Sequence, residues 1–535
     1  MRPVNAGCRR LRSLLGASLT AMGTSVALSL RHLDVKRPFL VLAALSAGAC
    51  HTVKTAARAV ILNDVHSRLN ATPVADVVSP TSTAELVDAI RAAKRAGHAV
   101  SLSAGRHAMG GQQFGTGTRH ISMSGMDDVL SFDRRRGLVR VEAGIGWPKL
   151  MADLHAQQSS PGPTWAIAQK QTGADELSLG GALSANAHGR GLRFRPMIQD
   201  VEAFTLVTVE GEVLTVSRTQ HPELFRLAIG GYGMFGAIAT VDLRLVPRLK
   251  LRRVVELVSI DELPAKVQER LSTGALYGDY QYKTDAASPD FMHVGVLSTY
   301  EPAPVETPIP ERQKRLSADD WNELLLLAHT RKREAFERYS RFYLSTNEQL
   351  YWSDAHQMSD YNDGYEDYLR RHMPGYTAGS LMITEVYVPR AQIREFSERI
   401  TQEARTHAFD LVYGTMRLIE RDEESFLAWA KQDYACVIFN LRVQHTPEGL
   451  SKAQHDFQRI IDRALEFGGS YYLTYHRWAR KDQVLTAYPQ FPEFLRWKRQ
   501  FDPEERFQSD WYRHYKAMFA DELRDAASPA TLPTS

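Results

Sequence analysis

The sequence contains few cysteines, which excludes a disulfide framework and argues against metal binding. Three cysteines occur in 535 residues, and two of them, Cys8 and Cys50, lie within the first fifty. Only Cys436 belongs to the body of the chain, inside the apolar run 434–439, so we expect it to be a buried structural thiol. No group of Cys and His residues has the spacing of metal ligands, and we therefore expect no metal site.

The chain also lacks a strong net charge and a convincing membrane-spanning run. Of the total charge of +3, residues 1–50 carry +6, from seven basic residues and one acid, which leaves −3 for the rest. The body therefore has no nucleic-acid signature. In the leader, the apolar stretch 14–30 is diluted by small polar residues, and the run 39–49 is shorter than the ~20 residues that a bilayer needs.

The leader has the composition of an export signal, because basic residues precede a short apolar run. Export would place the protein in the cell envelope or periplasm, and membrane association through the leader stays open. A cytoplasmic protein with an irregular start is the alternative interpretation.

Two glycine-rich segments are the most informative feature of the chain. They read SAGRHAMGGQ over 103–112 and LSLGGALSANAHG over 177–189. Glycine lets backbone amides approach a ligand closely and can adopt the positive φ that turns successive N–H groups toward one anion. A capped helix over 82–97 and a short strand over 99–103 are expected before the first segment. Two such loops in one domain indicate a large phosphorylated cofactor.

A third segment, Gly231 to Gly236, satisfies the pattern G-x-G-x-x-G but is not predicted to be a Rossmann site. That pattern has meaning only when a strand precedes it and a helix follows. Here residues 221–227 look helical and 237–245 alternate like a strand, so the order is reversed. We interpret the segment as a tight helix-to-strand turn, which either touches the cofactor or has only a structural role.

These segments resemble the vanillyl-alcohol oxidase and p-cresol methylhydroxylase superfamily. Residues 105–112 are similar to the first flavin loop of cytokinin dehydrogenases, and 179–189 to the second flavin loop of aldonolactone, alditol and decaprenylphosphoryl-ribose oxidases. Segments within 464–510 resemble the tail of the decaprenylphosphoryl-ribose oxidases. The resemblance covers roughly residues 65–250 and 455–520 and specifies the cofactor better than the substrate.

The resemblance implies an α+β fold with a split, two-subdomain FAD-binding domain of the PCMH type. A cap domain with a large antiparallel sheet flanked by helices would complete the fold. The expected boundaries are a leader over 1–60, the FAD-binding domain over 61–248, the cap over 249–478, a segment over 479–523 that returns to the FAD-binding domain, and a disordered tail over 524–535. Within the cap, residues 250–300 are expected to be strands and turns, and 317–371 helical and rich in tyrosine.

FAD is the implied cofactor. His107 stands where related oxidases carry the histidine that is bonded to the flavin, although Ala108 replaces the usual serine. The stretch 171–176 has no cysteine for a second covalent link. The residues expected to bind FAD are Ser103, Gly105, Arg106, His107, Ala108, Met109, Gly110, Gly111, Gln112, Gly173, Ser178, Gly180, Gly181, Ser184, Asn186, His188, Gly189, Gly236 and Ile238.

Four expected cap strands, 381–388, 410–420, 434–443 and 470–478, carry the candidate reaction centre. Alternation groups polar residues on one face of each strand: Glu385 with Tyr387, Tyr413 with Thr415 and Arg417, Asn440 with Arg442, and Thr474 with His476. In the family's arrangement this face would lie over the reactive ring of the flavin. The competing interpretation is a solvated outer face with paired charges.

The expected activity is FAD-dependent oxidation of a CH–OH group in a sugar, polyol or lactone, with oxygen or another molecule as electron acceptor. Oxidation of a C–N substrate of the cytokinin type and a flavin-binding envelope protein without turnover are the alternatives. His476 is the candidate base and Arg417 the candidate cation, with Asn440 and Arg442 beside them. Tyr475 occupies the lysine position of the decaprenylphosphoryl-ribose oxidases, but alternation turns it to the opposite face.

Overall fold

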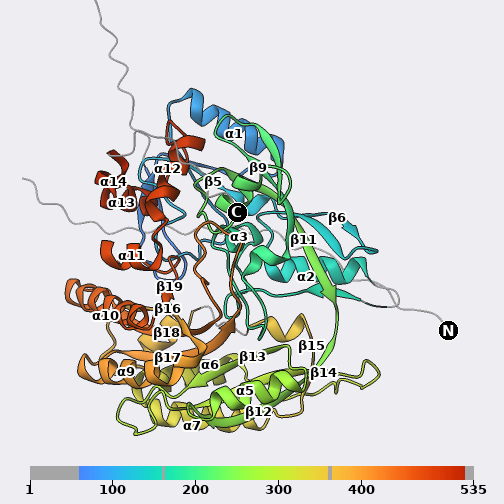
Figure 1. Ribbon diagram of the computed structural model, residues 1–535, viewed down its shortest axis with the longest axis vertical. Helices are drawn as coiled ribbons and strands as arrows, with labels where there is room; N and C mark the ends of the chain where they lie inside the picture. The colour runs from blue at the N-terminus through green and yellow to red at the C-terminus, as the bar shows by residue number, and fades with distance from the viewer. Residues whose placement is uncertain (1–58, 159–161, 163, 360–363, 525–535) are drawn as a thin grey trace, which may run out of the picture. The chain divides into compact units, whose positions relative to one another are not determined.

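The computed structural model describes residues 59–158, 162, 164–359 and 364–524 (Figure 1). The predictions for the leader and for the tail after residue 524 therefore lie outside the described residues. Within the described ranges, no helix has the length and apolar character required to cross a bilayer.

A small parallel sheet opens the FAD-binding region. Its strands are β3 (Asp76–Val78), β5 (Arg119–Ser122) and β4 (Val100–Ser103), in that order, and a separate pair joins β1 (Val60–Leu62) to β2 (Thr72–Val74). Helix α1 (Thr83–Arg95) begins at Ser82, whose hydroxyl accepts from the Glu85 N–H, and the chain turns at Gly97 with φ +71°. The predicted helix, strand and glycine loop are thus present in that order.

A second, antiparallel sheet forms the other half of this region. Its strand order is β10–β9–β11–β7–β6, and β8 also pairs with β11. The strands are β6 (Val129–Asp133), β7 (Leu138–Glu142), β8 (Trp165–Ile167), β9 (Val201–Val207), β10 (Val213–Ser217) and β11 (Ala237–Pro247). Helices α2 (Trp147–Gln157), α3 (Leu179–Ser184) and α4 (Pro222–Ala228) belong to the same region. Because α4 precedes residues 231–236 and β11 follows them, the Rossmann interpretation is correctly rejected.

The cap contains an eight-stranded antiparallel sheet with the order β15–β12–β14–β13–β17–β18–β16–β19. Green strands from near residue 250 and orange strands from near residue 440 lie in this one sheet (Figure 1). The strands are β12 (Lys250–Ser259), β13 (Tyr277–Tyr282), β14 (Val294–Ala303), β15 (Leu350–Trp352), β16 (Gly379–Pro389), β17 (Leu411–Ile419), β18 (Tyr434–Gln444) and β19 (Ser470–Tyr471). The predicted α+β fold with a large antiparallel cap sheet is confirmed.

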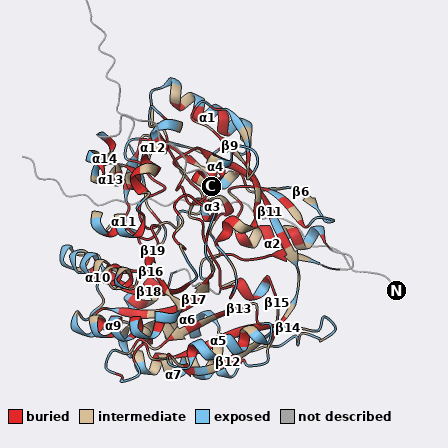
Figure 2. Cartoon of the chain, viewed as in Figure 1, coloured by how far each residue is buried: buried red, intermediate tan, exposed pale blue. Residues whose placement is uncertain are grey.

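Helices cover the cap sheet. Helices α9 (Ile393–Thr406) and α10 (Pro447–Glu466) pack against β16 and α10 also against β18, whereas α6 (Ala318–Thr330) contacts β17 and α7 (Lys332–Leu344) contacts β12 and β14. Strands β16 and β18 are buried almost throughout (Figure 2). Their polar side chains therefore do not form a solvated outer face.

The structure corrects three local expectations in the cap. Helix α5 (Leu263–Ser272) interrupts the strands of 250–300, and strand β15 and helix α8 (Tyr365–His372) share the region expected to be helical throughout. The fourth predicted strand ends at Tyr471 instead of residue 478. Beyond it the chain leaves the sheet, because the Gln112 amide of the first glycine loop donates to the carbonyls of Leu473 and Thr474.

The C-terminal segment contains α11 (Lys481–Ala487), α12 (Phe491–Phe501), α13 (Asp510–Met518) and α14 (Ala520–Arg524). Its backbone lies beside β4, where the Val100 N–H donates to the Arg506 carbonyl and the Gln508 N–H to the Val100 carbonyl. Thr116, which follows the first glycine loop, binds the Asp510 carboxylate through its N–H and hydroxyl. The expected domain boundaries themselves stay predictions.

Candidate functional site

A cavity of about 760 Å³ is lined by both glycine-rich loops and by the cap sheet. The first loop, helix α3, the start of β11 and Phe507 with Gln508 contribute one part of its wall. Strands β13, β16, β17 and β18 and helices α6 and α7 contribute the other. The segments that the sequence analysis singled out as a cofactor loop and as a reaction centre therefore share one space.

The first glycine loop lines the cavity with most of its predicted residues. These are Ser103, Gly105, Arg106, His107, Ala108, Met109 and Gln112. A Cβ at Gly105 would lie 2.4 Å from the Glu176 carbonyl oxygen, so only glycine allows this close approach of the two loops. Within this loop, Gly111 adopts the positive φ expected of a glycine, at +75°, and the non-glycine Arg106 also does, at +55°.

The second loop contributes Gly173, Ser178, Gly180, Gly181 and Ser184 to the cavity wall, and Gly236 with Ile238 lie beside them at the start of β11. Gly180 and Gly181 are helical residues of α3. They do not adopt positive φ, and the absence of a side chain instead lets neighbouring atoms approach the backbone closely. A Cβ at Gly180 would lie 2.8 Å from the Ala143 Cβ. At Gly181 the nearest atom would be the Ser178 hydroxyl oxygen at 3.0 Å, so its open side belongs to the cavity.

Five residues expected at the cofactor lie outside the cavity wall that the described residues form: Gly110, Gly111, Asn186, His188 and Gly189. The chain turns inward after α3, so the side chains that follow it are fully buried. The Asn186 amide donates to Asp422 at 2.8 Å, and His188 bonds to Glu385. Asn186 and His188 therefore hold the second loop in place through buried hydrogen bonds outside the cavity wall.

The cavity fits FAD. Its wall on the loop side is a cradle in which a Cβ at Gly105 would clash and one at Gly181 would reduce the open space. The side-chain amide oxygen Oε1 of Gln171 and the Thr172 hydroxyl are buried with no hydrogen-bond partner among the described residues, and both residues line the same wall. Unpaired polar atoms in a buried glycine-lined cradle are what a phosphorylated ligand with ring heteroatoms would pair.

The cap sheet presents a polar face to the cavity, as alternation predicts for β17 and β18. Thr415 and Arg417 line the cavity from β17, and Asn440 lines it from β18. All three are buried. In the part of the chain that the structure describes, the Arg417 Nε and Nη1, the Thr415 hydroxyl and the side-chain amide oxygen Oδ1 of Asn440 have no hydrogen-bond partner. Such groups are suited to the hydroxyl and carbonyl groups of a bound polar molecule.

Tyr475 lines the cavity and connects it to a buried carboxylate. Its hydroxyl donates to the Glu385 Oε2 at 3.2 Å and accepts from the Gln171 Nε2 at 3.2 Å. Burial and the neighbouring Glu385 charge raise the pKa of Tyr475 well above its usual value, so the phenol is neutral. Burial alone would raise the pKa of Glu385, but His188, the Tyr387 hydroxyl and the Arg417 charge hold it below the usual range.

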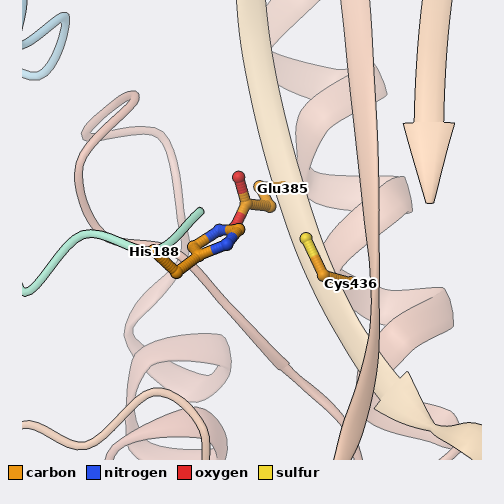
Figure 3. A group of neighbouring side chains, drawn as sticks. All are labelled: His188, Glu385 and Cys436. Carbon is orange, nitrogen blue, oxygen red and sulfur yellow. The ribbon is translucent and has the colours of Figure 1, made fainter. Parts of the chain in front are cut away.

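His188, Glu385 and Cys436 form a group that the spacing of the sequence does not reveal. Figure 3 shows Glu385 and Cys436 reaching from neighbouring strands toward His188, and their donor atoms lie within 4.8 Å of one another. The His188 Nε2 lies 2.6 Å from the Glu385 Oε1, to which the Tyr387 hydroxyl also donates. Burial raises the pKa of the Cys436 thiol, which keeps it protonated. Hydrogen bonding accounts for the group, and we assign no metal to it.

His476 does not face the cavity, and this part of the sequence prediction is wrong. Its ring stacks on Phe457 with centroids 4.8 Å apart and lies 5.6 Å from the Trp478 ring. Burial lowers the pKa of His476 to about 3. Because the strand ends at Tyr471, the alternation assumed beyond it does not hold: Thr474 lines the cavity as predicted, but Tyr475 lines it in place of His476.

Arg442 is also placed differently from the expectation. It lies near the end of β18, where it forms a buried ion pair with Glu366 and donates to the Thr377 carbonyl. Its charge is thereby compensated, and it does not line the cavity within the described residues. Alternation places Arg442 on the same strand face as Asn440, but Arg442 lies two residues further along β18, outside the cavity wall.

A second group of cavity residues carries no signal in the sequence. Arg190, Arg253, Asp279 and His356 line the cavity, and they are distant from one another in the sequence. Their residue types follow no motif. Only the tyrosine-rich composition of 317–371 pointed to this side of the cap, and Tyr343, Tyr351 and Tyr365 from that region do line the cavity.

Comparison with known proteins gives consistent matches. Residues 74–217 match a family described as FAD binding domain. The L-gulono-1,4-lactone dehydrogenase of Mycobacterium tuberculosis is 25% identical over 441 residues, which cover 82% of this chain and 95% of that protein. The L-gulonolactone oxidase of Bos taurus is 32% identical over 32% of this chain and 38% of its own length. The mitochondrial L-galactono-1,4-lactone dehydrogenase of Brassica oleracea is 31% identical over 29% of this chain and 24% of its own length.

Proposed function

We propose that this FAD-dependent oxidoreductase, whose residues 74–217 form an FAD-binding domain, oxidises a CH–OH group of a sugar lactone or a closely related sugar or polyol. Its relatives carry the names of lactone dehydrogenases and lactone oxidases, and one of them aligns over 82% of this chain. The substrate class is an inference from these names and from the polar character of the cap face.

The unpaired Arg417 guanidinium is the observation that carries the proposal. Arg417 is 7% exposed and lines the cavity, and two of its nitrogens have no partner among the described residues. Although the nearby Glu385 carboxylate compensates part of its charge, buried donors without acceptors are costly, so a bound oxygen-rich ligand would relieve this cost. Hydroxyl and carbonyl oxygens of a sugar lactone are suitable acceptors, and Thr415 with Asn440 would pair further groups of the same molecule.

The glycine-rich loops would hold the FAD. Ser103, Gly105 and Arg106 line the cavity from the first loop, and Ser178 with Gly181 line it from the second. When bound, FAD supplies the acceptor for a hydride from the substrate carbon. His107 lies on the same wall, and we propose it as the residue for a covalent bond to the flavin.

Tyr475 and Glu385 form a path for the hydroxyl proton. We propose that the substrate O–H donates to the Tyr475 oxygen while the Tyr475 proton passes to Glu385 Oε2, 3.2 Å away. The low pKa of Glu385 keeps the carboxylate ionised at neutral pH, so it can take the proton, although as a weak base. The substrate loses one proton and one hydride in total, and Glu385 gains the proton. Arg417 would stabilise the negative charge that develops on the substrate oxygen.

The electron acceptor and the location stay open parts of the proposal. Some relatives are named oxidases and others dehydrogenases, so oxygen and another acceptor are both candidates. Export by the leader, which lies outside the described residues, is proposed from its sequence alone. Fractionation of cells that express the tagged chain would test it.

A panel of donors tests the proposed activity. The FAD-loaded protein is mixed under anaerobic conditions with aldonolactones, polyols and amines, and loss of the flavin absorbance is followed. Lactones or polyols should bleach the flavin and amines should not. Arg417→Gln should weaken both binding and reduction, whereas Arg421→Gln, whose 59% exposed side chain lies beyond the end of β17, is the matched control. Bleaching by amines alone would overturn the proposal.

A further inference from the structure

A second cationic group lines the cavity away from the proton path. It consists of Arg190, His356 and Arg253, with Asp279 and Tyr300 beside them. The Arg190 guanidinium donates to the His356 carbonyl and to the His356 Nδ1 and lies 4.8 Å from the Tyr300 ring centroid. The His356 ring is stacked on Tyr300 with centroids 4.4 Å apart. Arg190 and His356 are 9% and 4% exposed, so both are held firmly inside the protein.

The positive charge of the two arginines in the group exceeds the negative charge of the nearby carboxylate. Asp279 lies 3.8 Å from Arg190, beyond a direct hydrogen bond. Arg253 bonds to neutral groups, the Tyr300 and Thr346 hydroxyls, and its guanidinium lies 4.6 Å from the Tyr351 ring centroid. Two guanidiniums therefore share one nearby carboxylate. Ring faces attract a cation but do not neutralise its charge.

Two hydrogen-bond donors of the group are also unused. The His356 Nδ1 accepts from Arg190, so the proton of the neutral ring resides on Nε2. Burial and the charges of Arg190 and Arg253 lower the pKa of His356 well below its usual value, which keeps the ring neutral. Across the described residues, the His356 Nε2 and the Arg190 Nε have no hydrogen-bond partner. Two buried donors next to excess positive charge are the complement of an anion.

Arg253, at one side of the group, is set apart from the proton path by the order of the cap sheet. It is on β12, and Glu385 is on β16, five strands further along the sheet, which corresponds to roughly 24 Å at about 4.8 Å per strand. Arg190 and Asp279 lie between these two strands, because the Gly278 N–H of β13 donates to the Arg190 carbonyl. Arg190 is nearer to the proton path, since it follows His188, which bonds to Glu385, by two residues. A molecule that contacts both the cationic group and Tyr475 must present an anion to the first and a hydroxyl group to the second.

We propose that Arg190 and His356 form an anion subsite, which binds a carboxylate or phosphate carried by the substrate away from the carbon that is oxidised. This inference rests on the proposed oxidation of a sugar-type CH–OH group and narrows its substrate to an anionic sugar derivative. The Arg190 Nε and the His356 Nε2 donate to the anion, and Arg253 adds positive charge behind them. Low local polarity makes these contacts stronger than the same contacts in water.

Three ligands that share one sugar ring test the subsite. Glucose is neutral, glucuronate carries a carboxylate at position six, and glucose 6-phosphate carries a phosphate there. Each is titrated into the FAD-loaded protein, and binding is read from the shift of the flavin spectrum, which requires no turnover. At least one anionic ligand should bind about 10- to 100-fold more tightly than glucose, since a hydrogen bond to a charged group contributes about 1.5–3 kcal/mol. The stronger of the two identifies the anion.

Variants locate the effect. Arg190→Gln and His356→Gln should each remove most of the preference for the anion and leave glucose affinity unchanged. Arg252→Gln, on β12 beside Arg253 and with a 47% exposed side chain, removes the same charge outside the cavity and should preserve the preference. Flavin content and melting temperature show whether each variant is folded. If Arg190→Gln is unstable, Arg190→Lys replaces it, because lysine keeps the positive charge but lacks the Nε–H donor of arginine.

The outcomes separate this inference from the proposed function. Equal binding of the three ligands, or an anion preference that survives in both glutamine variants, overturns the subsite, and oxidation of neutral lactones would then still support the proposed function. An anion preference that depends on Arg190 supports the subsite, even if no sugar reduces the flavin. In that case the proposed oxidation fails and the subsite stands as a ligand site. Glucose affinity that falls as far as anion affinity in Arg190→Gln also counts against an anion-specific role.

Discussion

Replacing Tyr475 with phenylalanine removes one oxygen atom from the cavity wall and interrupts the path to Glu385. The hydroxyl makes two hydrogen bonds of 3.2 Å, to Glu385 and from Gln171. Glu385 keeps its bonds to His188 and to the Tyr387 hydroxyl, so the buried carboxylate is not left without partners. The cost in folding free energy should therefore be about 2–4 kcal/mol, because one bond to a charged carboxylate (about 1.5–3 kcal/mol) and one neutral bond (about 0.5–1.5 kcal/mol) are lost.

The effect on the reaction should be at least as large as the effect on stability, and it is measured separately in folded protein. A positioned acid–base group accelerates proton transfer by about 10²- to 10⁴-fold, which corresponds to roughly 3–5 kcal/mol of barrier. Tyr475→Phe should slow anaerobic flavin reduction by such a factor. His476→Gln should have little effect on this rate, because the His476 ring stacks on Phe457 and lies outside the cavity wall.

Rapid mixing with a lactone that reduces the wild-type flavin measures this rate. Tyr472→Phe is the matched control, because Tyr472 also lines the cavity but its hydroxyl donates to the Ala185 carbonyl at 2.7 Å. Equal flavin content in all variants shows that the cofactor site is intact. If His476→Gln is slow and Tyr475→Phe is as fast as wild type, the proton does not travel through Tyr475 and the proposed path is refuted.

Three further predictions concern the cofactor and pH. Gly181→Val should abolish FAD binding by reducing the open space of the cradle. Gly146→Val, at a glycine outside the cavity wall, is the control and should leave the purified protein yellow. Equal yellow colour in both variants would contradict the proposal that Gly181 lies against the FAD. Acid precipitation should leave yellow colour in the wild-type pellet and release it from His107→Ala, and colour released from the wild type would disprove the covalent bond. The low pKa of His476, about 3 against 6.5 when unfolded, means that the unfolded chain binds more protons at mildly acidic pH, so stability should fall between pH 7 and pH 5. One such histidine contributes about 2 kcal/mol to that loss, and urea titrations of His476→Gln at both pH values should show a correspondingly smaller change.

The cofactor site could be predicted from the sequence because its signals are local. Gly105 and Gly180, which allow close approach, each lie inside one of the two glycine-rich segments that the sequence makes obvious. A capped helix and a short strand before the first loop follow from the spacing of residues 82–103. The alternation of β17 also predicted the face of Arg417 correctly, since that strand is regular around this residue.

The proton path could not be predicted because it depends on a strand that stops early. The sequence of residues 470–478 alternates no worse than that of its neighbours, but a side chain from the first loop binds the backbone after Tyr471. Long-range hydrogen bonds of this kind leave no periodic signal. The pairs of Arg190 with His356 and of His188 with Glu385 join residues more than 160 positions apart, which the sequence alone does not connect.

Anaerobic reduction of the flavin by a lactone with deuterium on its hydroxyl-bearing carbon tests the central claim most directly. The protein is purified with its FAD and mixed with L-gulono-1,4-lactone and related lactones and polyols, each with hydrogen or deuterium at the carbon to be oxidised. The account predicts that at least one of them bleaches the flavin and that deuterium slows the bleaching, because the C–H bond breaks as hydride leaves. A flavin that stays oxidised with every lactone and polyol would contradict the account.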